Sequence, residues 1–250
     1  MNLSNCIKSI AVLTFILSLN ACKKDNSAVT TSGTQVTFAL SATNPSNLLP
    51  ASITTPGMTT NSVGTNATSA SITWTSGTVN IASFKLEAKK KNTAIEITSK
   101  NLTNIDLFAI SPASISAAID TGTYTEIELR VLLVKSTTAA IPLTLKGNFT
   151  TQGGVVVPIE LDYNDDALIK VEAENITIDG KTDVATLAKL NLTKLISGMA
   201  AAQLDAAVRT NGAIVISSTV NAAIYNKIKD NILLCGSWGG FSHREKSERK

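Results

Sequence analysis

Residues 123–134, with the sequence TYTEIELRVLLV, decide the fold class of this chain. Apolar and charged side chains alternate within it, Ile127, Leu129, Val131 and Leu133 with Glu126, Glu128 and Arg130. A period of two predicts a β-strand that buries one face and presents the other to water. The turn residues Asp120, Thr121 and Gly122 come directly before it and predict that the chain reverses there.

Shorter alternating segments flank this strand on both sides. They fall at residues 35–40, 72–81, 84–88, 95–97, 105–107, 143–145, 155–161 and 169–178. The leucines at 187, 190, 192 and 195 fit either a strand or a helix, and we expect a strand over 186–192. Thr75-Ser76-Gly77 predicts a turn inside the second segment. The buried phase then changes before Phe84, which predicts a bulge near Ala82 or Ser83. Short strands separated by turn residues predict a mainly β protein built as a sandwich.

The last third of the chain changes its period. Ser197 is a candidate cap for a helix over 198–209, which Asn211-Gly212 would end. A four-residue repeat follows and predicts an amphipathic helix: Val220, Ile224, Ile228 and Ile232. Its narrow stripe fits either a helix that covers an open face of the sandwich or one that binds a partner or a membrane. We expect the first, and therefore a sandwich with two C-terminal helices packed on it.

The N-terminus combines three features of a secretory signal. Lys8 is positive, residues 10–19 (IAVLTFILSL) form a short apolar run, and the small residue Ala21 precedes Cys22. The run is shorter than the 20 or so apolar residues of a membrane span. An ordinary cleaved signal or a buried N-terminal helix would also fit parts of the pattern.

A cysteine directly after the small residue makes this segment similar to the signals of bacterial lipoproteins. The similarity implies that residues 1–21 are removed and that Cys22 carries acyl chains such as palmitate. Stable anchoring takes more than one chain. Lys23 stands where an aspartate would signal retention in the inner membrane, which favours the outer membrane.

These patterns divide the chain into four parts. We expect a signal peptide at 1–21, a flexible tether at 22–34, a β-rich domain at 35–235, and a charged, disordered tail at 236–250. Within the β-rich domain, residues 41–70 are rich in Ser, Thr, Asn and Pro and predict a long irregular loop.

Composition narrows the chemistry further. Removal of residues 1–21 takes away Lys8 alone among the charged residues, which lowers the formal net charge from +3 to +2. A nearly neutral domain predicts no nucleic-acid partner. His243 is the only histidine, so neither a Ser-His-Asp triad nor a histidine metal site is expected. Cys235 would remain without a disulfide partner and is predicted to be a small buried residue.

Residues 162–166, Asp-Tyr-Asn-Asp-Asp, are the candidate binding segment. The oxygens of Asp162, Asn164, Asp165 and Asp166 are hard ligands of the kind calcium prefers. Aspartate and asparagine also favour turns, so a solvated turn after the 155–161 strand is the alternative, and the one we expect. We therefore predict no metal site, no catalytic residue and no cofactor.

Two further features have a functional and a structural interpretation. Lys89, Lys90 and Lys91 are predicted to form a hairpin tip that either meets an anionic surface or keeps the protein soluble. Trp74 could stack on a sugar ring, but its place in a strand predicts a core residue.

Several segments together resemble a group of uncharacterised lipoproteins of Gram-negative bacteria with a domain of unknown function. The resemblance is carried by 72–81 (ITWTSGTVNI), 105–107 (IDL), 122–124 (GTY), 190–199 and 211–232. It implies an immunoglobulin- or transthyretin-like β-sandwich and no known catalytic residue.

The expected function is that of a lipid-anchored envelope protein whose domain is a non-enzymatic binding or structural module. Its partners are the membrane, through the lipid at Cys22, and a protein or glycan that the sequence does not identify. The alternative is a fimbrial or adhesin subunit made as a lipoprotein precursor. Such subunits usually end in a strand used for assembly, whereas this sequence predicts a helix and a tail.

Overall fold

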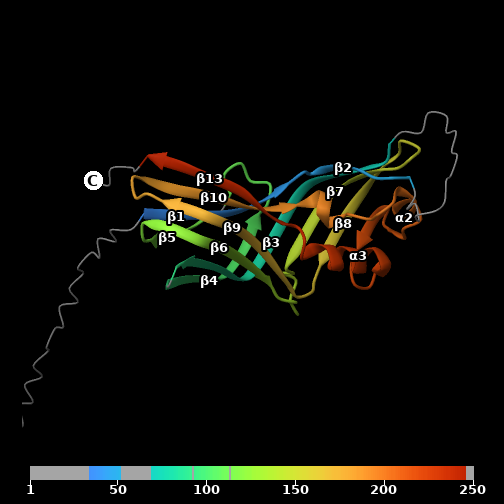
Figure 1. The fold of residues 1–250 in the computed structure, drawn as a ribbon. Coiled ribbons are helices and arrows are strands. Elements are labelled where there is room, and N and C mark those ends of the chain that lie inside the picture. Colours follow the sequence, from blue (N-terminus) through green and yellow to red (C-terminus); the bar gives the residue numbers. More distant parts are fainter. Residues whose placement is uncertain (1–33, 52–68, 92, 113, 246–250) are drawn as a thin grey trace, which may run out of the picture. The chain divides into compact units, whose positions relative to one another are not determined.

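The computed structural model describes residues 34–51, 69–91, 93–112 and 114–245, all within one compact unit that spans residues 32–250. The fold is mainly β, as predicted (Figure 1). The strands are β1 Thr34–Thr43, β2 Ser46–Leu48, β3 Ser71–Lys90, β4 Thr93–Asp106, β5 Ser114–Ile119, β6 Gly122–Leu133, β7 Leu143–Thr150, β8 Val156–Tyr163, β9 Ala167–Ile178, β10 Thr182–Asn191, β11 Arg209–Thr210, β12 Ala213–Ile216 and β13 Gly236–Glu245. The helices are α1 Leu192–Leu195, α2 Ala201–Asp205 and α3 Ala222–Ile232.

Strand β3 organises the larger sheet because it is long enough to pair with different strands along its length. Residues 71–79 pair with β7, and residues 83–89 pair with β6. Strand β4 runs antiparallel to β3 from Thr78 to Lys90. The sheet follows the order β11-β12-β8-β7-β3-β6-β9, with β2 and β4 also on β3.

The predicted turn at Thr75-Ser76-Gly77 is wrong, because β3 continues through it. The register with β7 shifts between Trp74 and Ser76, so Thr75 is the extra residue of a β-bulge. Turn-forming residues also suit a β-bulge, because a turn and a bulge both leave backbone groups outside the hydrogen-bond ladder of the sheet. The predicted change of buried phase is confirmed, with Ile81 and Phe84 buried on either side of it.

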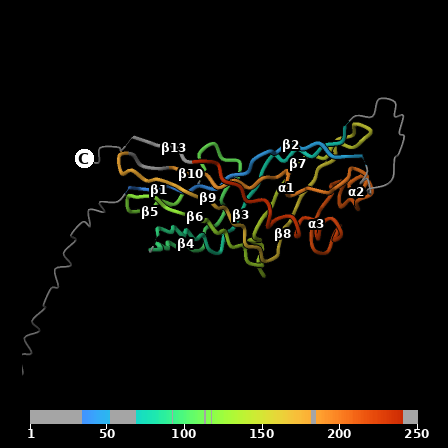
Figure 2. Tube along the Cα trace, in the orientation of Figure 1, coloured from blue at the N-terminus to red at the C-terminus, as the bar shows by residue number. Residues whose placement is uncertain are grey.

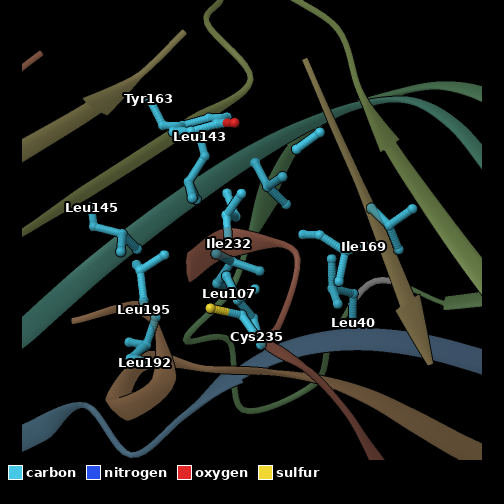
Figure 3. Packing of buried hydrophobic residues seen from close by; sticks show 14 of the residues in the cluster. Leu40, Leu107, Leu143, Leu145, Tyr163, Ile169, Leu192, Leu195, Ile232 and Cys235 are labelled. Atoms are coloured by element: carbon cyan, nitrogen blue, oxygen red, sulfur yellow. The ribbon is translucent and has the colours of Figure 1, made fainter. Parts of the chain in front are cut away.

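The smaller sheet follows the order β13-β10-β1-β5. Strand β1 pairs with β10 in parallel and with β5 in antiparallel orientation. One cluster of buried apolar side chains includes residues of both sheets, such as Phe38 of β1 and Leu86 of β3. Figure 3 shows ten labelled members, among them Leu145, Leu195, Ile232 and Cys235.

The strand predicted at 123–134 is confirmed as β6. Ile127, Leu129, Val131 and Leu133 are each at most 1 % exposed. The amphipathic helix is confirmed in α3, where Ile224, Ile228 and Ile232 are buried together with Tyr225. Since these residues join the common apolar cluster, α3 covers the core.

The helix predicted at 198–209 is too long, because only α2, Ala201–Asp205, lies within this range. Helix α1, Leu192–Leu195, precedes the range, and Ser197 caps neither helix. Asn191 caps α1 through its side-chain oxygen, which accepts from the backbone N–H of Thr193. Gly198 has a φ of 71°, in the left-handed region that interrupts a right-handed helix. Helix α2 then starts afresh after Ala200.

The disordered tail predicted at 236–250 is wrong for residues 236–245, which form β13 (Figure 1). Figure 2 shows the chain running from α3 to this strand. Strand β13 pairs antiparallel with β10, the strand that runs parallel to β1 on its other side. The packing of β13 requires a glycine at its first residue. A Cβ on Gly236 would lie 2.3 Å from the carbonyl oxygen of Lys170, on β9.

The loop predicted at 41–70 is partly wrong, because β1 continues to Thr43 and β2 occupies 46–48. Residues 52–68 lie outside the described residues, as do residues 1–33, which include the predicted signal peptide, Cys22 and nearly all of the predicted tether. Of the helices in the described ranges, none has the length and apolar character needed to cross a bilayer.

Candidate functional site

The candidate site begins with a second bulge, where β4 leaves its register with β3. Val79 pairs with Ile105 and Ile81 with Leu102, so two residues of β4 lie opposite Asn80. One of them, Asn104, has a φ of 55°. Asparagine tolerates this left-handed conformation better than most residues, which explains why the bulge forms here.

An apolar pocket of about 220 Å³ lies beside this bulge, where strands of both sheets meet. Its apolar lining is Phe38, Leu40, Ile81, Phe84, Leu102, Ile105 and Ile115. Three neutral polar residues complete the lining, Asn101, Thr103 and Ser114, and all three are exposed. The lining contains no charged residue. The pocket therefore combines a hydrocarbon interior with a polar, uncharged rim.

A second, larger hollow of about 800 Å³ lies over the smaller sheet. Small side chains of β1 and β10 line it, such as Ala39, Ser41 and Ala185. The segment after β4 closes one side, with Phe108 in the lining and Ile110 fully exposed at 104 %. This hollow offers little apolar surface for a ligand, because most of its lining residues are Gly, Ala, Ser or Thr.

The larger sheet carries an ordered array of charges across four neighbouring strands. Glu96, Glu87, Glu128 and Glu172 lie directly opposite one another on β4, β3, β6 and β9. The adjacent row consists of Lys85, Arg130 and Lys170. Like charges placed opposite one another destabilise a sheet. The row of cations beside them offsets this repulsion.

Ion pairs connect the two rows. Arg130 bonds Glu87 at 3.0 Å and also bonds Glu128, and Lys170 lies 3.6 Å from Glu128. Lys85 bridges Glu87 and Glu96 at 2.9 and 2.8 Å. The hydrogen bond from Lys85 lowers the pKa of Glu87, and that from Arg130 lowers the pKa of Glu128.

The same array contains a group of three carboxylates, Glu126, Glu128 and Glu172, whose oxygens lie within 4.8 Å of one another. Such a group has the ligand chemistry of a calcium site. The protein's own cations already meet two of its charges, since Lys89 lies 2.8 Å from Glu126 and Arg130 bonds Glu128. We interpret the group as part of the ion-pair network.

The predicted segment 162–166 has a structural partner for most of its polar groups. The oxygen of Asn164 accepts from the backbone N–H of Ser136, and its amide donates back to the Ser136 carbonyl. Asp166 accepts from the backbone N–H of Lys135, and Asp165 pairs with Lys229 at 2.6 Å. These bonds fasten a turn to the loop before β7 and to α3.

Asp162 stands apart from this turn, because it belongs to β8 and lies opposite Thr144. Burial raises the pKa of its carboxyl, and the nearby charge of Glu160 adds to the effect. The structure thus brings Asn164, Asp165 and Asp166 together at one turn, each with a protein partner, and leaves Asp162 in the strand. This arrangement supports the turn interpretation.

Most of the remaining candidate residues lie in strands or in the core, where each contacts other parts of the protein. Lys90 ends β3 at the predicted hairpin tip, donates to the carbonyl of Thr121 and lies over the ring of Tyr124. Trp74 is 2 % exposed, as its strand position predicted. Cys235 is buried after α3, where burial raises the pKa of its thiol to about 12. His243 lies in β13 rather than in a tail.

Sequence reasoning missed the apolar pocket, because its walls come from β1, β3, β4 and β5 and share no local motif. The available signal was Asn101 and Asn104, two left-handed asparagines inside an alternating strand. Residues of this type in a strand interior indicate an irregularity.

Comparison of the chain with models of protein families, with curated proteins and with solved structures finds no match in any of the three.

Proposed function

We propose that this chain is a lipid-anchored protein of the bacterial envelope, held at the outer membrane by acyl chains on Cys22. In this proposal its β-rich domain is a non-enzymatic binding or structural module. The observation that carries the anchor is the order of residues at the N-terminus, a positive residue, a short apolar run, and Ala21 before Cys22.

The position of the domain supports the proposal. Strand β1 begins at Thr34, twelve residues after Cys22. A chain of this length spans at most about 40 Å. The module would therefore work close to the membrane surface. The apolar pocket and the hollow over the smaller sheet are surfaces on which such a module can bind a partner.

The test compares three versions of the full chain in cells grown with radiolabelled palmitate. The unchanged chain and Cys6→Ala are expected to incorporate label and to sediment with membranes. Cys22→Ala is expected to lose the label and to leave the membrane fraction. Cys6→Ala is the matched control, because Cys6 precedes the expected cleavage site. A Cys22→Ala protein that stays membrane-bound without label contradicts the proposal.

We further propose that the two sheets form a sandwich of the immunoglobulin or transthyretin kind. The shared apolar cluster supports this, as does the close approach of Gly236 to β9. Two parallel pairs, β1 with β10 and β8 with β12, depart from the antiparallel sheets of immunoglobulin domains. If the two sheets form such a sandwich, the order in which its strands are connected differs from that of immunoglobulin domains.

A second candidate function, a fimbrial or adhesin subunit, gains support from β13. A helix and a tail at the C-terminus, as the sequence predicts, would disfavour this function, whereas the chain has a strand there, at the edge of the smaller sheet. Edge strands can be exchanged between subunits through backbone hydrogen bonds. Filaments seen by electron microscopy of the purified protein, and lost on deletion of 236–250, would favour this function over a monomeric module.

A further inference from the structure

We propose that the apolar pocket beside the β4 bulge binds one linear alkyl chain, such as the end of a lipid acyl chain. This inference does not rest on the lipid anchor at Cys22, because it concerns a site within the described strands. The pocket is lined by residues of β1, β3, β4 and β5. Nothing in the function proposed above requires it to hold a ligand.

The lining sets the chemical class of the ligand. Seven apolar side chains form the interior, and the only polar groups are the neutral side chains of Asn101, Thr103 and Ser114. Burial of an ionic group here would cost free energy without a partner charge. A hydrocarbon chain fits, with a hydroxyl or ester group at the rim, where amide and hydroxyl groups can hydrogen-bond to it.

The volume sets the length of the chain. An apolar protein cavity of about 150 Å³ accommodates benzene. At the same volume per carbon, a cavity of about 220 Å³ holds roughly nine carbons. A complete lipid does not fit, so only the end of a longer chain would enter.

The burial of the walls favours a slim ligand over the surface of a partner protein. Phe38, Ile81 and Phe84 line the pocket, yet they are only 1 to 4 % exposed. A folded surface cannot reach side chains that are so nearly closed off from solvent. Leu102 and Ile115 also line the pocket and are half-buried.

The bulge keeps the pocket wall in place. Asn80 on β3 holds Asn104 on β4 through a hydrogen bond of 2.8 Å from the Asn104 backbone N–H. It also donates to the carbonyl of Ile141 at 2.6 Å. These bonds fix Leu102 and Ile105 on either side of the extra residue. The site is therefore formed before any ligand binds.

The test titrates 1-alkanols from butanol to decanol into the purified chain carrying Cys22→Ala, which has no acyl chain of its own to compete for the pocket. Binding is followed by NMR of the isoleucine methyl groups. The signals of Ile81, Ile105 and Ile115 are expected to shift, while those of Ile159 and Ile228 stay in place. Affinity is expected to rise about fourfold per added methylene and to level off at roughly nine carbons.

Variants of Leu102 test the pocket itself. Leu102→Trp fills it and is expected to weaken octanol binding at least tenfold, whereas Ile97→Trp, half-buried on the same strand outside the pocket, leaves binding unchanged. Leu102→Ala enlarges the pocket and is expected to move the plateau to longer alkanols. Shifts spread over all isoleucines, an affinity independent of chain length, or a plateau unmoved in Leu102→Ala would overturn the proposal.

Discussion

The side-chain oxygen of Asn80 accepts a hydrogen bond from the backbone N–H of Asn104 at 2.8 Å. The two residues lie on β3 and β4 at the point where the register of these strands shifts. The amide group of Asn80 simultaneously donates to the carbonyl of Ile141, in the segment before β7. One side chain thus satisfies the backbone group that the bulge leaves out of the ladder, and it links the bulge to a third segment.

Asn80→Ala is expected to lower the free energy of unfolding by about 2 kcal/mol, because it removes both hydrogen bonds and leaves two backbone groups without them. Urea denaturation followed by circular dichroism measures this change. Asn148→Ala is the control, since Asn148 is exposed on the neighbouring strand β7, and its effect should stay within about 0.5 kcal/mol. Equal effects of the two substitutions would refute the role of Asn80.

Gly236→Ala is expected to destabilise the protein by about 1–3 kcal/mol or more, because the new methyl group would overlap the Lys170 carbonyl and force β13 away from β9. Thermal unfolding measures the loss. Gly153→Ala provides the comparison, since the nearest atom to its Cβ would be the Thr151 hydroxyl at 3.8 Å. A Gly236→Ala protein as stable as Gly153→Ala would show that the sheets do not meet at this residue.

The charge array predicts a loss of stability in acid. Hydrogen bonds from Lys85 and Arg130 lower the pKa values of Glu87 and Glu128 below the usual 4.5. A carboxyl with a lowered pKa binds fewer protons in the folded than in the unfolded protein. Its stabilisation is therefore complete above the unfolded pKa and disappears as the pH falls through the folded one. We expect the free energy of unfolding to fall from about pH 5 downward.

Urea titrations at a series of pH values measure this slope. Glu128→Gln is expected to flatten it, because Glu128 is nearly buried between Arg130 and Lys170 and could no longer ionise. Glu174→Gln, at an exposed position on β9, should leave the slope close to that of the unchanged protein. If both variants give the same slope, the array does not supply the acid sensitivity.

Calcium is expected to leave the thermal midpoint unchanged. The oxygens of Asn164, Asp165 and Asp166 already hold Ser136, Lys229 and Lys135. A ligand that binds only the folded protein raises its midpoint with concentration, so differential scanning calorimetry at millimolar calcium is a direct measurement. A rise that Asp165→Asn abolishes would instead establish a calcium site at this turn.

Strands and helices whose apolar residues recur at a regular spacing in the sequence were predictable. Strand β6 alternates Ile127 and Leu129 with Glu126 and Glu128, and α3 repeats isoleucine every four residues. Both signals are local, and tertiary structure only had to supply a partner for the apolar face. Asp165 and its neighbours were likewise predictable as a turn, from the backbone preferences of their residue types.

Elements that depend on distant pairing were not predictable. Strands β5 and β13 have few large apolar side chains, and they exist because β1 and β10 offer them backbone hydrogen bonds. The pocket depends on the same kind of information, since four strands form it and the bulge at Asn104 lies beside it. The residue types at these positions do not by themselves predict a strand or a pocket, because both depend on which distant strands lie beside them.

Intact mass spectrometry of the protein extracted from outer membranes tests the central claim most directly. We expect a polypeptide that begins at Cys22, with a mass above that of residues 22–250 by the mass of a diacylglyceryl group and an amide-linked acyl chain. Peptide sequencing would place the added mass on Cys22. A polypeptide that begins elsewhere, or one with the bare mass of its residues, would contradict the lipid anchor and the envelope function built on it.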